Sequence, residues 1–227
     1  MLFLKEVPQT EGDIRIAADL INRIEKTKRA LPHKKTTMNI NATLPEPILP
    51  ADMNVPLLEF PSEELARQMT IEEWKIWEAI KPWEFLDLAW QKKNKKELAP
   101  NIIAFTERFN CINGWVATTM CLTENLRDRI KVLRKFIDLA MALKQIGNFN
   151  GMMEIWSGLN RGPVRRLKKT FASLPRNYQS KIIELEQITE PQSAYKNLRE
   201  KIKAADPPIL PYLGMYQTDM TFIEENK

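Results

Sequence analysis

Residues 148–171 read NFNGMMEIWSGLNRGPVRRLKKTF, a stretch rich in glycine, asparagine and methionine. It holds three of the chain's seven glycines and five basic residues, but it has no His, Cys or Asp and a single Glu. The pattern predicts two short helices that meet at a sharp corner, with Asn150 capping the first and Gly162-Pro163 beginning the second. Gly147, directly before the stretch, fits the left-handed end of a preceding helix. No Walker lysine or preceding strand is present, so the glycines favour close helix packing over a phosphate loop.

Apolar residues spaced three and four apart continue on both sides and predict helices through most of the chain. One such series is Ile102, Phe105, Phe109, Ile112, Val116 and Met120. A helix is also expected to begin at Thr70, because Thr70 and Glu73 have the spacing of a capping box, with Ile71 and Trp74 facing inward. No segment alternates with period two for long. The predicted fold class is therefore all-α, a single irregular helical bundle of about ten helices.

The first 56 residues differ from the rest in composition and in the spacing of apolar residues. Residues 13–28 show helical periodicity, and five prolines lie between Pro32 and Pro56. We expect an N-terminal helix and a proline-rich linker over residues 1–56, followed by one helical domain over residues 57–227. No run of about 18 apolar residues occurs, so the sequence predicts no transmembrane segment.

Few side chains could carry out covalent catalysis. His33, the single histidine, lies in the proline-rich linker, and Cys111 and Cys121 are ten residues apart in an expected helix. Unpaired, semi-buried cysteines fit a reducing compartment. Two cysteines and one histidine are too few for a Cys/His zinc site, so we predict no metal and no cofactor. The pairs Glu72-Glu73 and Glu224-Glu225 are expected to be solvated charges.

The chain is mildly basic, with a net charge of +5 and a pI near 9.1. Its 34 basic residues are interspersed with 29 acidic ones, which favours ordinary solvated charges. The basic residues of 161–169 leave a helical nucleic-acid binder open as an alternative. Phe171 is the only aromatic residue beside them and no nucleic-acid-binding motif is present. A solvated or partner-facing stripe is therefore preferred, and no nucleic-acid partner is predicted.

Five motifs, in order along the chain, resemble the catalytic domain of Ras-type guanine-nucleotide exchange factors, the Son-of-sevenless-like family. They are FNGMMEIWSGLNRGPVRRLKKTF, LARQMTIEEWKIWEAIKPWEFLDLAW, TERFNCINGWV, YKNLREKI and PPILPYLGMYQTDMTFIEE, so the resemblance runs from about Leu57 to Lys227. It implies a protein that binds the switch regions of a Ras-family small GTPase, Ras- or Rap-like. Such a protein promotes GDP release by displacing Mg²⁺ and phosphate contacts, without covalent chemistry.

The resemblance also implies roles for individual residues. The family's pocket for an aromatic side chain of the GTPase's second switch is matched by Thr106, Met153, Tyr195 and Tyr212. Glu107 and Asn110, on the same helix as Thr106, are implied to face that switch. Other positions of the GTPase-binding surface are matched by Ser157, Asn160, Gly162, Lys168 and Phe171. Thr221 and Glu225 match the exchange-promoting positions of an inserting helix, near the Mg²⁺ site and the phosphate loop.

This chain departs from the family pattern near its end. Gln217 replaces an apolar residue, Asn226 replaces a glycine, and the sequence stops at Lys227, within the family's helical hairpin. We therefore expect a fragment of a longer protein or a shortened relative that is weak or inactive in exchange. Only residues 1–56 could be the remnant of the family's N-terminal helical module. An inactive GTPase-binding scaffold or effector is the alternative. The resemblance implies a cytoplasmic location, with recruitment to the inner membrane surface left open.

Overall fold

The computed structural model describes residues 46, 48 and 56–226, and this part of the chain is helical. In it, ten α-helices and two 3-10 helices occur without any strand, which confirms the all-α prediction. The elements are η2 (Leu57–Glu59), α2 (Ser62–Ala79), η3 (Pro82–Gln91), α3 (Lys95–Leu98), α4 (Pro100–Leu122), α5 (Leu126–Gln145), α6 (Phe149–Leu159), α7 (Gly162–Arg165), α8 (Lys168–Ala172), α9 (Arg176–Thr189), α10 (Gln192–Ala204) and α11 (Leu213–Glu225). The helix expected at residues 13–28, and nearly all of the expected linker, lie outside the described residues.

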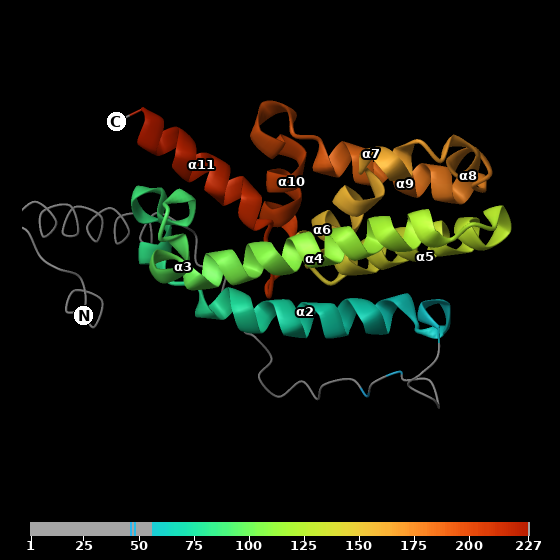
Figure 1. Ribbon diagram of the computed structural model, residues 1–227, viewed down its shortest axis with the longest axis horizontal. Coiled ribbons are helices and arrows are strands. Elements are labelled where there is room, and N and C mark those ends of the chain that lie inside the picture. The colour runs from blue at the N-terminus through green and yellow to red at the C-terminus, as the bar shows by residue number, and fades with distance from the viewer. Residues whose placement is uncertain (1–45, 47, 49–55, 227) are drawn as a thin grey trace, which may run out of the picture. The chain divides into compact units, whose positions relative to one another are not determined.

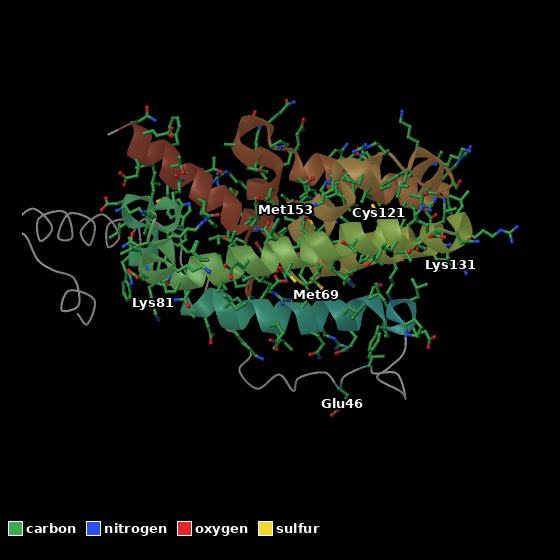
Figure 2. All side chains as sticks on the ribbon, in the orientation of Figure 1. Glu46, Met69, Lys81, Cys121, Lys131 and Met153 are labelled. Atoms are coloured by element: carbon green, nitrogen blue, oxygen red, sulfur yellow. The ribbon has the colours of Figure 1, made fainter. Side chains whose placement is uncertain are left out.

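Three helices form the centre of the bundle. The helices α4 and α5 are joined by a short loop, and α6 packs against both of them. The helix α2 covers one side of this centre, while α7 to α10 lie on the other side (Figure 1). Figure 2 draws the side chains in the same orientation, and they fill the space between α2 and α4. The main core is formed by buried residues of α4, α5 and α6, among them Val116, Phe136 and Ile155.

The close approach of α6 to α4 depends on a glycine. A Cβ atom added to Gly158 would lie 2.7 Å from the Cβ of Val116 and 2.8 Å from the carbonyl oxygen of Asn113. A larger residue would therefore push the two helices apart. The structure confirms the prediction from sequence that glycines in this stretch serve close packing.

The prediction of a helix beginning at Thr70 is wrong. Instead, α2 runs without interruption through this position, and the Thr70 hydroxyl donates to the carbonyl of Ala66 at 2.7 Å. Ile71 is 49% exposed and Trp74 is also exposed, so neither faces inward. The buried face of α2 includes Ala66 and the carboxylate of Glu73. Because the buried face of α2 includes an acidic residue, the spacing of its apolar residues alone does not identify that face.

A short crossing joins the start of α6 to the segment before α11. Gly147 has φ +80° and ends α5 as predicted, because this conformation favours glycine. Its carbonyl accepts a hydrogen bond from the Leu210 amide at 3.0 Å, and the Phe149 amide donates to the Leu210 carbonyl at 2.9 Å. Leu210 and Leu213 are buried in a second apolar cluster with Trp90. These contacts fix the position from which α11 begins.

The described cysteines are more exposed than expected, and several tryptophans are exposed as well. Cys111 and Cys121 are both exposed and free rather than semi-buried. Trp90 and Trp156 are buried, whereas three other tryptophans, including Trp115, are more than a third exposed. Among the described residues, no helix has the length and apolarity needed to cross a bilayer.

Candidate functional site

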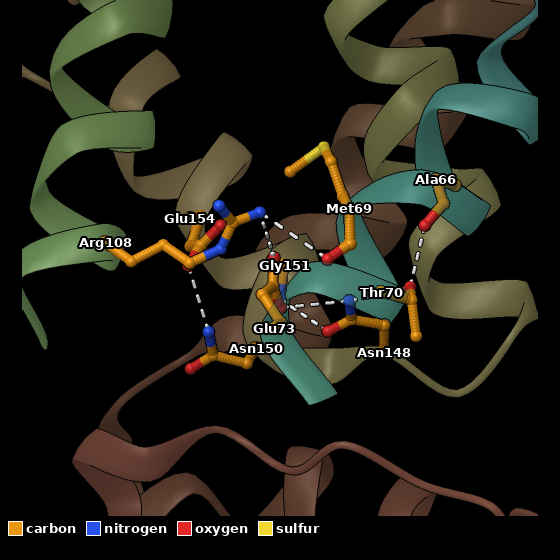
Figure 3. A network of polar contacts seen from close by, with 9 residues as sticks. All are labelled: Ala66, Met69, Thr70, Glu73, Arg108, Asn148, Asn150, Gly151 and Glu154. Atoms are coloured by element: carbon orange, nitrogen blue, oxygen red, sulfur yellow. Dashed lines mark hydrogen bonds and ion pairs between the residues drawn. The ribbon is translucent and has the colours of Figure 1, made fainter. Parts of the chain in front are cut away.

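The first asparagine of the 148–171 stretch anchors α6 in the core (Figure 3). Asn148, not Asn150, caps α6, and its Oδ1 accepts from the amide of Gly151 at 2.7 Å. Its Nδ2 donates to the Thr70 hydroxyl at 2.9 Å and to Glu73 Oε2 at 3.0 Å, both on α2. Asn148 is fully buried. Its cap and its two side-chain bonds therefore lock the orientation of α6 against α2.

Two carboxyl groups meet beside Asn148. Glu73 of α2 and Glu154 of α6 are both fully buried, so the prediction that Glu73 is a solvated charge is wrong. Glu154 Oε1 accepts from Asn150 Nδ2 at 3.1 Å, and Arg108 lies 3.7 Å from Glu73 Oε1. Burial, and then the negative charge of Glu73, raise the pKa of Glu154 to about 10. Burial also raises the pKa of Glu73.

A proton shared by this pair explains its burial. Glu73 Oε1 and Glu154 Oε2 have no other hydrogen-bond partner, and a proton on Glu154 would join them. Two ionised carboxylates in hydrogen-bonding contact, with one arginine nearby, would be strongly unfavourable. A proton on Glu154 removes one of the two charges, and Arg108 faces Glu73. The pair belongs to the structural support of α6 rather than to an exposed acid–base site.

A groove opens on the far side of α6 from α2. Its volume is about 600 Å³, and it is lined by Met153, Trp156, Ser157, Asn160, Glu186, Gln187, Thr189, Glu190 and Pro191. Three of the residues that sequence reasoning assigned to the GTPase-binding surface, Met153, Ser157 and Asn160, lie together here. The groove combines an apolar floor with acidic side chains at Glu186 and Glu190. The sequence did not predict the groove residues in α9 and directly after it, because they belong to no recognisable motif.

Two tyrosines assigned to the predicted pocket contact one another. The rings of Tyr195 and Tyr212 are 5.8 Å apart and nearly perpendicular, and Phe109 lies 5.7 Å from Tyr212. Burial, and then the neighbouring Tyr195, raise the pKa of Tyr212 to about 12. Met153 belongs to the apolar cluster against which both tyrosines pack. The hydroxyl of Thr106 turns back to donate to the Ile102 carbonyl at 2.8 Å, so it offers a partner no free donor.

Tyr195 is held in an uncommon backbone conformation. Ser193, Ala194 and Tyr195 have φ between 53° and 60°, in the left-handed region that residues with a Cβ rarely occupy. The Arg199 guanidinium donates to the Ala194 carbonyl at 2.6 Å and to Asp219 Oδ1 at 2.7 Å. Arg199 therefore connects this turn to α11.

The remaining predicted residues of α4, α7 and α8 lie at the surface. Glu107 and Asn110 are exposed on α4, and Lys96 lies 3.9 Å from Glu107. Gly162 and Lys168 are exposed at the starts of α7 and α8. Phe171 is half-buried, and the Arg165 guanidinium lies 5.3 Å from its ring centre.

The predicted exchange-promoting residues lie on the distal half of α11. The Thr221 hydroxyl donates to the Gln217 carbonyl at 2.9 Å and accepts from Gln91 Nε2 of η3 at 3.1 Å. Glu225, in the last turn, is exposed. In Figure 1, the C-terminal end of α11 lies away from α6 and α9, the helices that line the groove. Thr221 and Glu225 therefore belong to a different part of the surface from Ser157 and Asn160.

Comparisons with known proteins agree with this architecture. A family model described as RasGEF domain matches residues 64–227. Ras guanine nucleotide exchange factor A of Dictyostelium discoideum is 38% identical over 189 residues, which cover 82% of this chain and 31% of that protein. Factor J of the same organism is 35% identical over 215 residues, covering 93% of this chain and 26% of that protein. This chain thus spans a third or less of the length of these relatives. The chain belongs to the RasGEF domain family.

Proposed function

We propose that the chain is the exchange-factor region of a guanine-nucleotide exchange factor that acts on a Ras-family small GTPase, Ras- or Rap-like. Its match to the RasGEF domain over residues 64–227 is the observation that carries the proposal. In support, the groove collects Met153, Ser157 and Asn160 on one surface of α6. A protein with such a partner acts in the cytoplasm, so we propose that location too.

The proposed activity needs differential binding rather than covalent chemistry. An exchange factor that binds the nucleotide-free GTPase more tightly than the loaded form weakens nucleotide binding by the same factor. An apolar groove and a projecting helix meet this requirement without a nucleophile or a general base. In this proposal the α6 groove and the tyrosine pair hold the second switch, and Thr221 and Glu225 of α11 displace Mg²⁺ and phosphate contacts.

The other proposed GTPase contacts lie around the groove in two groups. Glu107 and Asn110 extend the contact along α4, next to the tyrosine pair. Gly162, Lys168 and Phe171 extend it along α7 and α8. Thr106 contributes its methyl group, because its hydroxyl is already bonded within α4.

Release of a fluorescent GDP analogue from a panel of Ras- and Rap-like GTPases tests the proposal. We expect the protein to accelerate release from at least one of them. Asn160→Ala should slow this exchange, whereas Asn177→Ala, an exposed asparagine at the start of α9, should not. The control for Thr221→Ala is Thr218→Ala on the same helix. In both threonines the hydroxyl donates to the carbonyl four residues earlier.

The outcomes separate exchange from simple binding. No acceleration across the panel, together with no GTPase binding, contradicts the proposal. Binding that is equally tight to the GDP-loaded and nucleotide-free GTPase indicates a scaffold or effector instead, because equal affinities shift no equilibrium. Equal effects of the Asn160 and Asn177 variants would contradict the placement of the contact surface on the groove.

A further inference from the structure

Positive charge is concentrated in one segment of the chain. Residues 155–183 carry no acidic residue and seven basic ones, namely Arg161, Arg165, Arg166, Lys168, Lys169, Arg176 and Lys181. Because the whole chain has a net charge of +5, the remaining residues sum to 5 − 7 = −2. The basic character of the protein therefore belongs to α7, α8 and the first half of α9.

Most of these charges face solvent without an ion-pair partner in the described part of the chain. Arg165 pairs with Glu186 at 3.3 Å and Lys181 pairs with Asp138 at 2.5 Å. The other five are exposed, and none forms an ion pair within the described part of the chain. In Figure 1 these helices lie at the end of the bundle where α4 turns into α5, away from α3 and η3.

Exposed aliphatic side chains lie at the same end. Leu122, the last residue of α4, is 74% exposed, and Leu126, the first residue of α5, is 37% exposed. Arg129 connects this corner to α8, donating to the Thr123 carbonyl at 2.8 Å and to the Thr170 hydroxyl at 2.9 Å. Arg129 thus holds the corner that carries the two leucines against α8, the helix of Lys169. Glu124 is exposed at the corner too, and the nearby carboxylate of Asp128 is paired with Lys131 at 2.8 Å.

We propose that Leu122, Leu126, Lys169 and Arg176, named here the basic tip, dock on the surface of a bilayer that contains anionic phospholipid. A lipid headgroup region accepts both features at once, since basic side chains pair with lipid charges and aliphatic side chains enter the acyl boundary. Nucleic acid would satisfy the charges only. It would leave Leu122 in water, and the basic tip has no aromatic side chain for bases to stack on.

The basic tip leaves the groove accessible. Arg176 begins α9 and Thr189, which lines the groove, ends it, so the helix separates the two sites by about 20 Å. Docking of the tip therefore leaves the groove open, although Lys169 neighbours Lys168, which is proposed to extend the GTPase contact along α8. The inference stands without that proposed function, because its test contains no GTPase.

Co-sedimentation of the protein with vesicles tests the proposal. We expect binding to phosphatidylcholine vesicles that contain about 30% phosphatidylserine at low salt, and weak binding to pure phosphatidylcholine or at high salt. The double variant Lys169→Gln/Arg176→Gln should lower the partition coefficient roughly 30-fold. Leu122→Ser should lower it about tenfold, with little dependence on salt.

Matched variants at the opposite end provide the control. Lys92→Gln/Lys93→Gln removes two exposed lysines between η3 and α3, and Leu98→Ser changes a leucine as exposed as Leu126. These variants should bind vesicles like the unaltered protein. Equal losses in the two double variants, or no binding to the anionic vesicles, overturn the proposal. Binding to a duplex oligonucleotide without binding to anionic vesicles also overturns it.

Discussion

Replacing Glu154 by glutamine should remove a large pH dependence from the stability of the protein. In the folded state Glu154 keeps its proton up to a pKa of about 10, because burial and the charge of Glu73 oppose ionisation. The unfolded chain ionises near the ordinary value of 4.5. Between these two values unfolding releases a proton, so the contribution of Glu154 to stability is complete below pH 4.5 and falls as pH rises.

The magnitude follows from linkage. One proton released on unfolding lowers the free energy of unfolding by about 1.4 kcal/mol per pH unit, hence by roughly 2.7 kcal/mol between pH 6 and pH 8. In Glu154→Gln the amide oxygen can accept from Asn150 Nδ2, and the amide nitrogen can donate to Glu73 Oε1, which otherwise lacks a partner. The variant should therefore keep the fold and gain stability relative to the unaltered protein as pH rises.

Urea denaturation followed by circular dichroism at half-unit steps from pH 5.5 to pH 8.5 measures this difference. Glu78→Gln, which removes an exposed carboxylate from α2, is the control and should change the pH profile little. Parallel profiles for the unaltered protein and Glu154→Gln would refute the shared proton. A variant less stable at every pH by the same amount would show that packing, and not protonation, governs this position.

Other substitutions test the supports of α6 and α11. Gly158→Ala should destabilise the protein by about 1–3 kcal/mol in urea denaturation, because its Cβ would meet Val116, whereas Gly162→Ala, with no atom closer than 3.9 Å, should be tolerated. Asn148→Ala should cost about 2–4 kcal/mol in the same assay, since it removes a helix cap and leaves buried polar atoms unpaired. Arg199→Ala should change global stability by less than about 1 kcal/mol but speed amide hydrogen exchange in α11, which it ties to α10.

The fold class could be predicted from the sequence because most helices bury an apolar stripe at regular spacing. The prediction failed in α2, where Glu73 occupies a buried position and Trp74 an exposed one. Spacing alone cannot show that a carboxyl group is buried, since its burial depends on Asn148 and Glu154, which are distant in sequence from Glu73. Glu154 gave a signal that could have been used. It is the single acidic residue in an otherwise apolar helix, and such a residue is either exposed or paired.

The candidate site could be predicted only where a motif marks it. Ser157 and Asn160 lie in such a motif and line the groove, whereas Glu190 and Pro191 of the opposite wall do not. The groove forms between α6 and the end of α9. The spacing of residues along one helix does not show how it packs against another, so this wall could not be predicted. The predicted pocket residues Tyr195 and Tyr212 depend similarly on Arg199, which holds the left-handed turn at the start of α10 against α11.

The stretch at residues 148–171 serves two surfaces because successive residues on a helix point about 100° apart. Asn148 and Glu154 face α2 and fix the helix in the core, while Met153, directly before Glu154, faces the groove. A change in the buried pair therefore acts on the helix that forms the groove floor. If Glu154 loses its proton, two carboxylates face one arginine, and their repulsion acts on α6, which Asn148 and the close contacts of Gly158 otherwise hold in place. Stability should thus fall from pH 4.5 upward, whereas the groove itself should change only near pH 10, where the folded protein loses this proton. The Glu154→Gln protein is the reference for any measurement of GTPase binding near that pH.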